Sequence, residues 1–354
     1  MFTMFRISLT LVCLFATLVP VTDVWATPHS LLLSTFTESS VLRFDATDGT
    51  FTDELVTPGS GGLDFSLGLT IGPDGNLYVS SRQTDSVFRY DQNTGAFIDE
   101  FTSGGTMDIP TDLVFGPDGN LYVSSFGTSS VLRFDGITGA FIDDFISGGS
   151  QEGAEGLVFG PDGNLYVSST SSGEVKRYNG TTGVFIDDFV TGLTSPTAIL
   201  FGPDGNLYVG DTTTSLVTRH NGTTGAFIDN FIDDGTNLAT PIGMRFGPDG
   251  NFYVVSQGDG GVQRFDGTTG VFIDTFATQP GLNFPTWILF TDDLLSDGFE
   301  SGNTDVWSGT VNNPWTARRS ASSSSSWASP PWSTVASPTP RVSGGWIWVS
   351  SSSI

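Results

Sequence analysis

Residues 31 to 290 contain one sequence unit written six times, and this internal repeat constrains the fold more than any other feature. The fullest copy, Phe115 to Phe145, reads F-G-P-D-G-N-L-Y-V-S-S, a short variable stretch, and then S-V-L-R-F-D-G-I-T-G-A-F-I-D-D-F. A period of about 44 residues with four strand-like segments is typical of a β-propeller blade. Six such copies are enough to close a ring.

Four short segments recur in each copy, and we call them A (apolar), B (L-Y-V-S), C (V-x-R-aromatic) and D (F-I-D-x-F). All are rich in Val, Phe, Tyr and Leu and are bounded by Gly, Pro, Asp and Asn, as strands usually are. The G-P-D-G-N stretch between A and B and the D/N-G-x-T-G stretch between C and D favour tight hairpin turns. Each copy is therefore predicted to be a four-stranded antiparallel meander.

The two ends of the repeat array indicate how the ring closes. The chain enters on segment B at Leu31 with no A before it, and leaves on an A segment, residues 287–290, with no B after it. Pairing these two ends removes two exposed strand edges. We therefore expect an all-β fold, a six-bladed β-propeller whose C-terminal strand 287–290 joins the first blade.

The pattern P-x-G-L-x-F-G-P-D-G-N-L-Y-V-S followed by V-x-R-F-D resembles the NHL-repeat and streptogramin-lyase-like six-bladed propellers, which are related to the gluconolactonase group. The resemblance covers residues 31–290. It implies the fold, but such propellers include lyases, lactonases and binding scaffolds. The lyase members imply histidine and a metal-bound acid at the central channel, and the lactonase-like members imply carboxylate and amide ligands around one divalent ion.

Outside the repeats the chain changes character. Residues 1–26 carry Arg6, an apolar run and a small residue before Thr27, which predicts a secretory signal peptide. Residues 27–295 are the predicted propeller, 296–308 a short D-G-F-E-S-G segment, and 309–354 a Ser-, Trp- and Pro-rich tail predicted to be disordered. The single Cys13 lies in the leader. We expect a secreted or periplasmic protein without a transmembrane segment in its mature chain.

The charge of the chain is strongly negative, with 13 Lys and Arg against 38 Asp and Glu. This field repels nucleic acid, which we exclude as a partner. Most basic residues have a structural explanation, because an arginine occupies the same place on segment C of every copy (Arg43, Arg89, Arg133, Arg177, Arg219 and Arg264). We expect these arginines to pair within each blade with the repeated acids of segment D.

Comparing the copies with one another separates shared scaffold from residues free to specialise. The A–B and C–D turns are near copies, whereas the B–C and D–A loops vary and lie together at the opposite end of the propeller. Variable loops on a rigid scaffold are where binding residues tend to lie. We predict a ligand-binding face there, with Glu38, Arg82, Asp85, Phe126, Glu174, Asp211, Asp259 and Trp287 as its candidate residues.

Asp112 and Glu155 come from neighbouring copies at adjacent segment-A positions, so their carboxylates are predicted to approach each other near the axis. Such an oxygen pair suits Ca²⁺ or Mg²⁺, although no cofactor is required by the sequence. Catalytic residues are not evident, since the chain has only His29 and His220, and His220 occupies a place held by Phe or Tyr in the other copies.

The sequence therefore favours an exported, monomeric scaffold that binds a protein, glycan or small molecule. The alternative is a metal-dependent lactonase or lyase with its ion at the central channel. Whether the protein is an enzyme is left open by the sequence, with the balance toward a binding protein.

Overall fold

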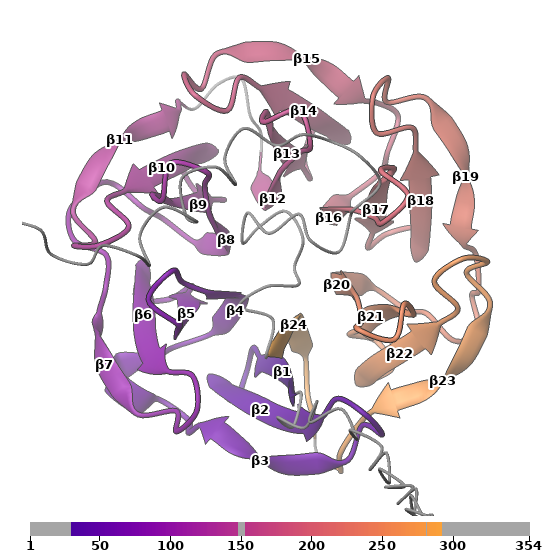
Figure 1. The fold of residues 1–354 in the computed structure, drawn as a ribbon, viewed down its shortest axis with the longest axis horizontal. Helices are drawn as coiled ribbons and strands as arrows, with labels where there is room; N and C mark the ends of the chain where they lie inside the picture. The colour runs from indigo at the N-terminus through magenta and orange to yellow at the C-terminus, as the bar shows by residue number, and fades with distance from the viewer. Residues whose placement is uncertain (1–29, 148–152, 281, 292–354) are drawn as a thin grey trace, which may run out of the picture. The chain divides into compact units, whose positions relative to one another are not determined.

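The computed structural model describes residues 30–147, 153–280 and 282–291, which form six four-stranded antiparallel sheets arranged in a ring (Figure 1). The only helical element among these residues is a short 3-10 turn, η1 (Ser60–Gly62). The predicted six-bladed all-β propeller is confirmed. The predicted leader 1–26, the segment 296–308 and the tail 309–354 lie outside the described residues, as does Thr27–His29 of the predicted propeller. None of the described residues forms a helix long and apolar enough to cross a bilayer.

Each blade runs from an inner strand A to an outer strand D. Blade 1 consists of β24 (Pro285–Thr291), β1 (Ser30–Thr35), β2 (Ser40–Asp45) and β3 (Phe51–Val56). Blade 2 consists of β4 (Ser66–Ile71), β5 (Asn76–Ser81), β6 (Ser86–Asp91) and β7 (Phe97–Glu100). Blade 3 consists of β8 (Pro110–Phe115), β9 (Leu121–Ser125), β10 (Ser130–Phe134) and β11 (Phe141–Ile146).

The remaining blades repeat this order. Blade 4 consists of β12 (Ala154–Phe159), β13 (Leu165–Ser169), β14 (Glu174–Tyr178) and β15 (Phe185–Val190). Blade 5 consists of β16 (Pro196–Phe201), β17 (Leu207–Asp211), β18 (Leu216–His220) and β19 (Phe227–Ile232). Blade 6 consists of β20 (Pro241–Phe246), β21 (Phe252–Ser256), β22 (Gly261–Phe265) and β23 (Phe272–Ala277).

Blade 1 is built from both ends of the repeat array, as the sequence predicts. Strand β24 pairs antiparallel with β1, with Leu31 opposite Phe290 and Leu33 opposite Ile288. In Figure 1 the orange β24 lies beside the indigo β1 at the inner edge of blade 1. The last described strand thus closes the ring between the first and last blades.

The core between blades is built from a tyrosine that recurs on strand B. In blade 3 the Tyr122 ring meets Phe145 of its own strand D edge-on and Phe159 of the next blade's strand A in the same way. Its hydroxyl donates to Asp118 in the A–B turn, so the polar end of this buried side chain is satisfied. The same arrangement recurs in blades 2, 4, 5 and 6.

A buried serine on strand B joins each of four blades to the next. In blade 3 the Ser124 hydroxyl accepts a hydrogen bond from the Asp112 N–H (2.9 Å) and donates one to the carbonyl of Glu155 in blade 4 (2.6 Å). Ser34, Ser80 and Ser168 make the equivalent bonds in blades 1, 2 and 4. One hydroxyl therefore fixes two inner strands at once.

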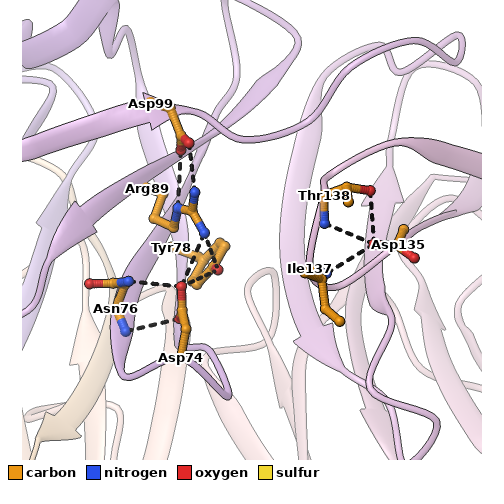
Figure 2. Close-up of polar contacts among 8 residues, drawn as sticks. All are labelled: Asp74, Asn76, Tyr78, Arg89, Asp99, Asp135, Ile137 and Thr138. Atoms are coloured by element: carbon orange, nitrogen blue, oxygen red, sulfur yellow. Dashed lines mark hydrogen bonds and ion pairs between the residues drawn. The ribbon is translucent and has the colours of Figure 1, made fainter.

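The predicted arginine pairs on strand C are confirmed in all six blades. Figure 2 shows Arg89, which donates from Nε and Nη2 to the two oxygens of Asp99 on strand D. The corresponding pairs are Arg43–Asp53, Arg133–Asp143, Arg177–Asp187, Arg219–Asp229 and Arg264–Asp274. Each guanidinium except that of Arg43 also lies over a buried phenylalanine on strand D or, in blade 2, directly after it, at 4.8–5.2 Å from the ring centre.

Replacement of one such arginine is expected to have a small effect. Arg133→Met removes a bidentate ion pair and a cation–π contact, but Asp143 is nearly half exposed and stays solvated. We expect a loss of about 1 kcal/mol in the free energy of unfolding, measured by urea denaturation. Arg82→Met, which removes no described ion pair, is the control and is expected to cost less than about 0.5 kcal/mol. Equal losses in the two variants would contradict the role of the pair.

Candidate ligand-binding face

The two ends of the propeller differ in how their acidic side chains are used. At one end, here called the turn face, the A–B and C–D turns hold their own acids. Asp135 accepts hydrogen bonds from the backbone of Ile137 and from both the backbone and hydroxyl of Thr138 (Figure 2). Asp74 likewise accepts from Asn76 and Tyr78 (Figure 2). These turn acids stabilise the hairpins, and they recur in most of the blades.

The opposite end, here called the loop face, consists of the B–C and D–A loops. Its B–C loops are four-residue turns at 36–39, 82–85, 126–129, 170–173, 212–215 and 257–260. The D–A loops vary more in length and sequence, and residues 148–152 of one of them lie outside the described part. The loop face is therefore where the blades differ most from one another.

Several side chains of the loop face form hydrogen bonds to the backbone of the next blade. The last residue of the B–C turn has a positive φ in blades 1, 2, 3 and 5, at Ser39, Asp85, Ser129 and Ser215. In each case its side-chain oxygen accepts a hydrogen bond from the N–H of the residue that precedes the next blade's strand A. In blade 2 this bond joins Asp85 Oδ1 to the Ile109 N–H at 2.9 Å. Asp85 thus has a structural partner on the predicted face.

Asp211 has an even more complete set of partners. Its carboxylate is buried and accepts four backbone N–H bonds, from Thr194, Ser195, Thr213 and Thr214. Although burial raises its pKa, these backbone hydrogen bonds more than offset that effect and hold the pKa below the usual value. Asp211 orders the loops of blade 5.

The other predicted loop acids also contact neighbouring protein groups. Glu38 accepts from Thr37 and Asn283, Glu174 pairs with Lys176, and Asp259 accepts from Ser256. These three carboxylates remain at least partly exposed. Phe126 is half-buried and packs near Gly153 of the following blade.

A second group of predicted residues comes together on the inner strands. Asp112 of β8, Glu155 of β12 and Trp287 of β24 occupy equivalent or adjacent strand-A positions. Their backbones are fixed by the buried serines, since Ser124 binds both Asp112 and Glu155, and Ser34 accepts from the Trp287 N–H. We call Asp112, Glu155, Trp287, Arg245 and Arg82 the axial cluster, because electrostatic or hydrogen-bonding contacts link them near the inner strands.

Asp112 is the most buried charge of the axial cluster, with 8% of its surface exposed. Its Oδ1 accepts from the Leu113 N–H (2.9 Å) and its Oδ2 from the Leu157 N–H of the next blade (3.1 Å). Burial raises the pKa of this carboxyl to about 6, even though the positive charge of Arg245, the two backbone bonds and a Trp287 hydrogen bond act in the opposite direction.

Glu155 is partly exposed and its carboxylate makes no hydrogen bond among the described residues. Desolvation and the nearby Asp112 charge raise its pKa to about 7, while the guanidinium of Arg82 opposes the shift. The Asp112 charge thus acts on Glu155, while the predicted approach of their carboxylates stays a prediction. The pair is flanked by two guanidinium groups rather than by further acids.

A divalent ion would need more ligands than this pair supplies. No group of three or more His, Cys, Asp or Glu side chains that could hold a metal is present among residues 30–147, 153–280 and 282–291. Both Asp112 oxygens are already bonded to backbone N–H groups, and Arg245 supplies a positive charge beside them. The described residues therefore do not fit a resident Ca²⁺ or Mg²⁺ ion. The predicted ion site at Asp112 and Glu155 stays a prediction.

Arg245 is the functional candidate that the sequence analysis missed. It lies on β20 at a strand-A position that is uncharged in every other blade: Thr70, Val114, Val158, Leu200 and Leu289. A copy-by-copy comparison of strand A would have identified it. Arg245 lies near the end of its strand, away from the loops and strand-A starts that vary most between the copies.

His220 packs as the sequence predicts. It is buried on strand C of blade 5, where Nε2 lies 2.9 Å from the Thr218 hydroxyl and the ring meets Phe227 edge-on. Burial lowers its pKa, so the imidazole is neutral at pH 7. It is not part of the axial cluster.

The serine contact beneath the axial cluster gives a direct prediction. Ser124→Ala leaves the buried Asp112 N–H and Glu155 carbonyl without their shared partner. We expect a loss of about 2 kcal/mol in unfolding free energy. The control is Ser171→Ala, in an exposed loop turn of blade 4, which is expected to lie within about 0.5 kcal/mol of the wild type. A Ser124→Ala protein as stable as the control would show that the hydroxyl is dispensable.

The ring of six four-stranded blades, closed by a strand from the far end of the repeats, defines a six-bladed β-propeller. The profile of the virginiamycin B lyase family matches residues 55–280, and the chain belongs to that family. No curated protein matches the chain.

Solved structures with the same fold come from proteins of different kinds. A chain of a nidogen–laminin complex is 15% identical and has a TM-score of 0.59, covering 74% of this chain and 98% of its own. Virginiamycin B lyase from Staphylococcus aureus is 17% identical, with a TM-score of 0.55 and coverage of 74% and 87%. A catalytically inactive His-to-Ala variant of that lyase with quinupristin is 14% identical, with a TM-score of 0.51 and coverage of 75% and 82%. At these identities the likeness shows the fold.

Proposed function

We propose that this protein is an exported binding propeller that takes its ligand on the loop face, next to the axial cluster. The observation that carries the proposal is the contrast between the two faces. On the turn face the same acids hold the same hairpins in most blades, whereas near the loop face Arg82, Glu155 and Trp287 have no equivalents in the other blades. The six blades present the same scaffold to a ligand, so a ligand that is not itself six-fold symmetric must be recognised by residues that the blades do not share.

Export is part of the proposal and is supported by the leader-like residues 1–26. The formal net charge of −25 disfavours nucleic acid and anionic membranes and favours an isolated, soluble propeller. A protein, glycan or small molecule with apolar surface remains as the class of ligand.

A lyase reaction is less well supported than binding. The related lyase structure was made catalytically inactive by replacing one histidine with alanine. The one histidine among the described residues of this chain is the buried His220 of blade 5, and it points into the packing of strand C rather than to the axial cluster. Membership of the family is therefore not sufficient to assign the lyase reaction to this chain.

The metal-dependent alternative is tested by metal content. Mass spectrometry of the purified full chain is expected to find less than about 0.1 divalent ion per molecule, and a chelator is expected to shift the melting temperature by less than about 1 °C. A resident ion would add its binding free energy to folding, so its removal would lower the melting temperature by several degrees. One ion per chain with such a shift would favour the enzyme alternative.

The location of the binding face is tested by blocking each end of the propeller. The mature chain lacks cysteine, so Gln83→Cys in a B–C loop and Ile137→Cys in a C–D turn each give one site for a bulky maleimide–polyethylene glycol. Both proteins are applied to printed glycan and peptide arrays before and after labelling.

We expect the polymer at residue 83 to abolish the array signal and the polymer at residue 137 to leave it unchanged. Loss of signal only with the label at residue 137 would place binding on the turn face and overturn the proposal. Absence of any bound glycan or peptide would count against recognition of these two ligand classes.

A further inference from the structure

One basic side chain on the loop face, Arg82, makes no ion pair among the described residues, although its charge acts on Glu155. The six strand-C arginines and Lys176 are ion-paired, and the charge of Arg245 acts on the buried Asp112 carboxylate. Of the basic residues that the structure describes, this leaves Arg82, whose guanidinium has no carboxylate within ion-pairing distance and makes no side-chain hydrogen bond. In a chain with so many acids, an unpaired guanidinium that is only partly exposed is unusual.

Arg82 is held in place by an aromatic stack. Its guanidinium carbon lies 5.5 Å from the centre of the Phe36 ring, and that ring lies 4.6 Å from the ring of Phe65. The Arg82 N–H also donates to the Phe65 carbonyl at 3.0 Å. A guanidinium that lies over a ring can still donate two parallel hydrogen bonds to a carboxylate from the N–H groups at its edge.

A third phenylalanine is joined to Phe36 through the backbone. Phe284 lies just before β24, and its carbonyl accepts a hydrogen bond from the Phe36 N–H at 3.0 Å. The Phe284 side chain is 54% exposed, although it is a large apolar group. We call Phe36, Phe65, Phe284 and Arg82 the aromatic–guanidinium patch. It draws on the B–C loops of blades 1 and 2 and on the D–A connections that lead into β4 and β24.

The backbone under this patch is unfavourable for phenylalanine. Phe65 has a φ of 56° and Phe284 a φ of 46°, in the left-handed region where bulky residues are rare. The scaffold shares this conformation at the equivalent positions of blades 3, 4 and 6, at Ile109, Gly153 and Thr240, and of these only Gly153 adopts it without cost. The aromatic side chains at residues 65 and 284 are therefore retained at a site where the backbone favours glycine. For Phe284 core packing does not explain this, because its ring is mostly exposed.

We propose that the aromatic–guanidinium patch binds a small arylcarboxylate, with the carboxylate on the N–H edge of Arg82 and the aromatic group against Phe36 and Phe284. This deepens, and rests on, the proposed binding function of the loop face. Charge complementarity selects the carboxylate, because Arg82 is the described cation of this face that makes no ion pair. Glu155, on which its charge acts, makes no hydrogen bond with it. The surrounding acids repel anions that lack an apolar group, since such ions gain too little from the patch.

The test uses 3-phenylpropanoate as the probe and the full chain, with saturation-transfer NMR titration as the measurement. We expect a dissociation constant in the millimolar range, which is normal for a ligand of this size on an open surface. The uncharged 3-phenylpropan-1-ol is expected to bind at least about ten-fold more weakly, since it cannot accept the bidentate bonds.

Matched variants separate the two parts of the patch. Arg82→Gln is expected to weaken 3-phenylpropanoate binding about ten-fold and to leave 3-phenylpropan-1-ol unaffected, while Arg82→Lys recovers part of the loss. Phe284→Ser is expected to weaken both ligands about five-fold. Ile137→Ser removes an even more exposed apolar side chain from the turn face and is expected to change neither ligand. A thermal melt of each variant checks that it is folded.

Equal binding of 3-phenylpropanoate by the wild type and Arg82→Gln would overturn the inference, as would no detectable binding to the wild type. A peptide ending in phenylalanine that binds more than ten-fold tighter than the probe, and depends on Arg82, would overturn the assignment to a small molecule. The array experiment does not use these ligands. The two tests can therefore fail separately. If 3-phenylpropanoate does not bind but the polymer at residue 83 still blocks the array signal, this inference is wrong and the proposed function is still supported.

Discussion

A chain that ends at Pro280 is expected not to fold. The truncation removes β24, which supplies strand A of blade 1 and pairs with β1 along its length. The side chains of this strand are almost completely buried. Ile288 and Phe290 lie between the first and last blades, and Leu289 lies between the first and second. Burial of each such side chain contributes about 1.5–3 kcal/mol, so the loss of the strand is comparable with the whole stability of a domain.

The effect is measured by circular dichroism melting and by limited proteolysis. We expect no cooperative melt and rapid digestion, because the edge of β1 and the faces of two blades become exposed. The control ends at Ser296, beyond the last residue of β24, and is expected to melt cooperatively within about 3 °C of the full chain. A Pro280 truncation that melts like this control would show that ring closure by β24 is not needed.

The scaffold could be predicted because the same physical constraint is repeated in each copy. Arg133 faces Asp143 on the adjacent strand, and the same pair recurs in the other five copies, so the ion pairs follow from spacing alone. The closing strand followed from counting segments at the two ends of the array. Such features depend on strand periodicity and on which segments are neighbours, and both can be seen in the sequence.

The candidate site was less predictable because it depends on loop geometry. Asp85 lies in a variable loop and Asp211 ends β17, and nothing in their spacing indicates that backbone N–H groups from the D–A connections would bond to them. The stack of Phe36, Phe65 and Arg82 joins two blades through residues far apart in sequence. Asp112 and Glu155 were predictable as neighbours because they lie on regular inner strands.

Arg245→Leu is expected to destabilise the protein strongly at pH 8 and weakly at pH 5. Arg245 is the main positive charge acting on the buried Asp112 carboxylate. Without it, Asp112 is a buried charge whose remaining partners are backbone N–H groups and Trp287, and we expect a loss of about 3 kcal/mol at pH 8.

The pH dependence of that loss has a definite sign. The pKa of Asp112 is already raised to about 6 in the native protein, above its ordinary value of 3.8, and the loss of Arg245 raises it further. The native state then binds a proton more readily than the unfolded chain, so stability falls as pH rises through this interval and recovers toward pH 5. Glu155, with a pKa raised to about 7, acts in the same direction in both proteins.

Urea unfolding at pH 5 and pH 8 measures the effect, and a double variant shows whether it arises from charge. Asp112→Asn combined with Arg245→Leu removes both charges, and at pH 8 we expect it to recover to within about 1 kcal/mol of the wild type. Glu155→Gln combined with Arg245→Leu is the matched control, which still contains the Asp112 carboxylate and should keep most of the loss. If Arg245→Leu costs the same at both pH values and neither double variant recovers, Arg245 acts through packing, and the axial cluster is not held together by its charges.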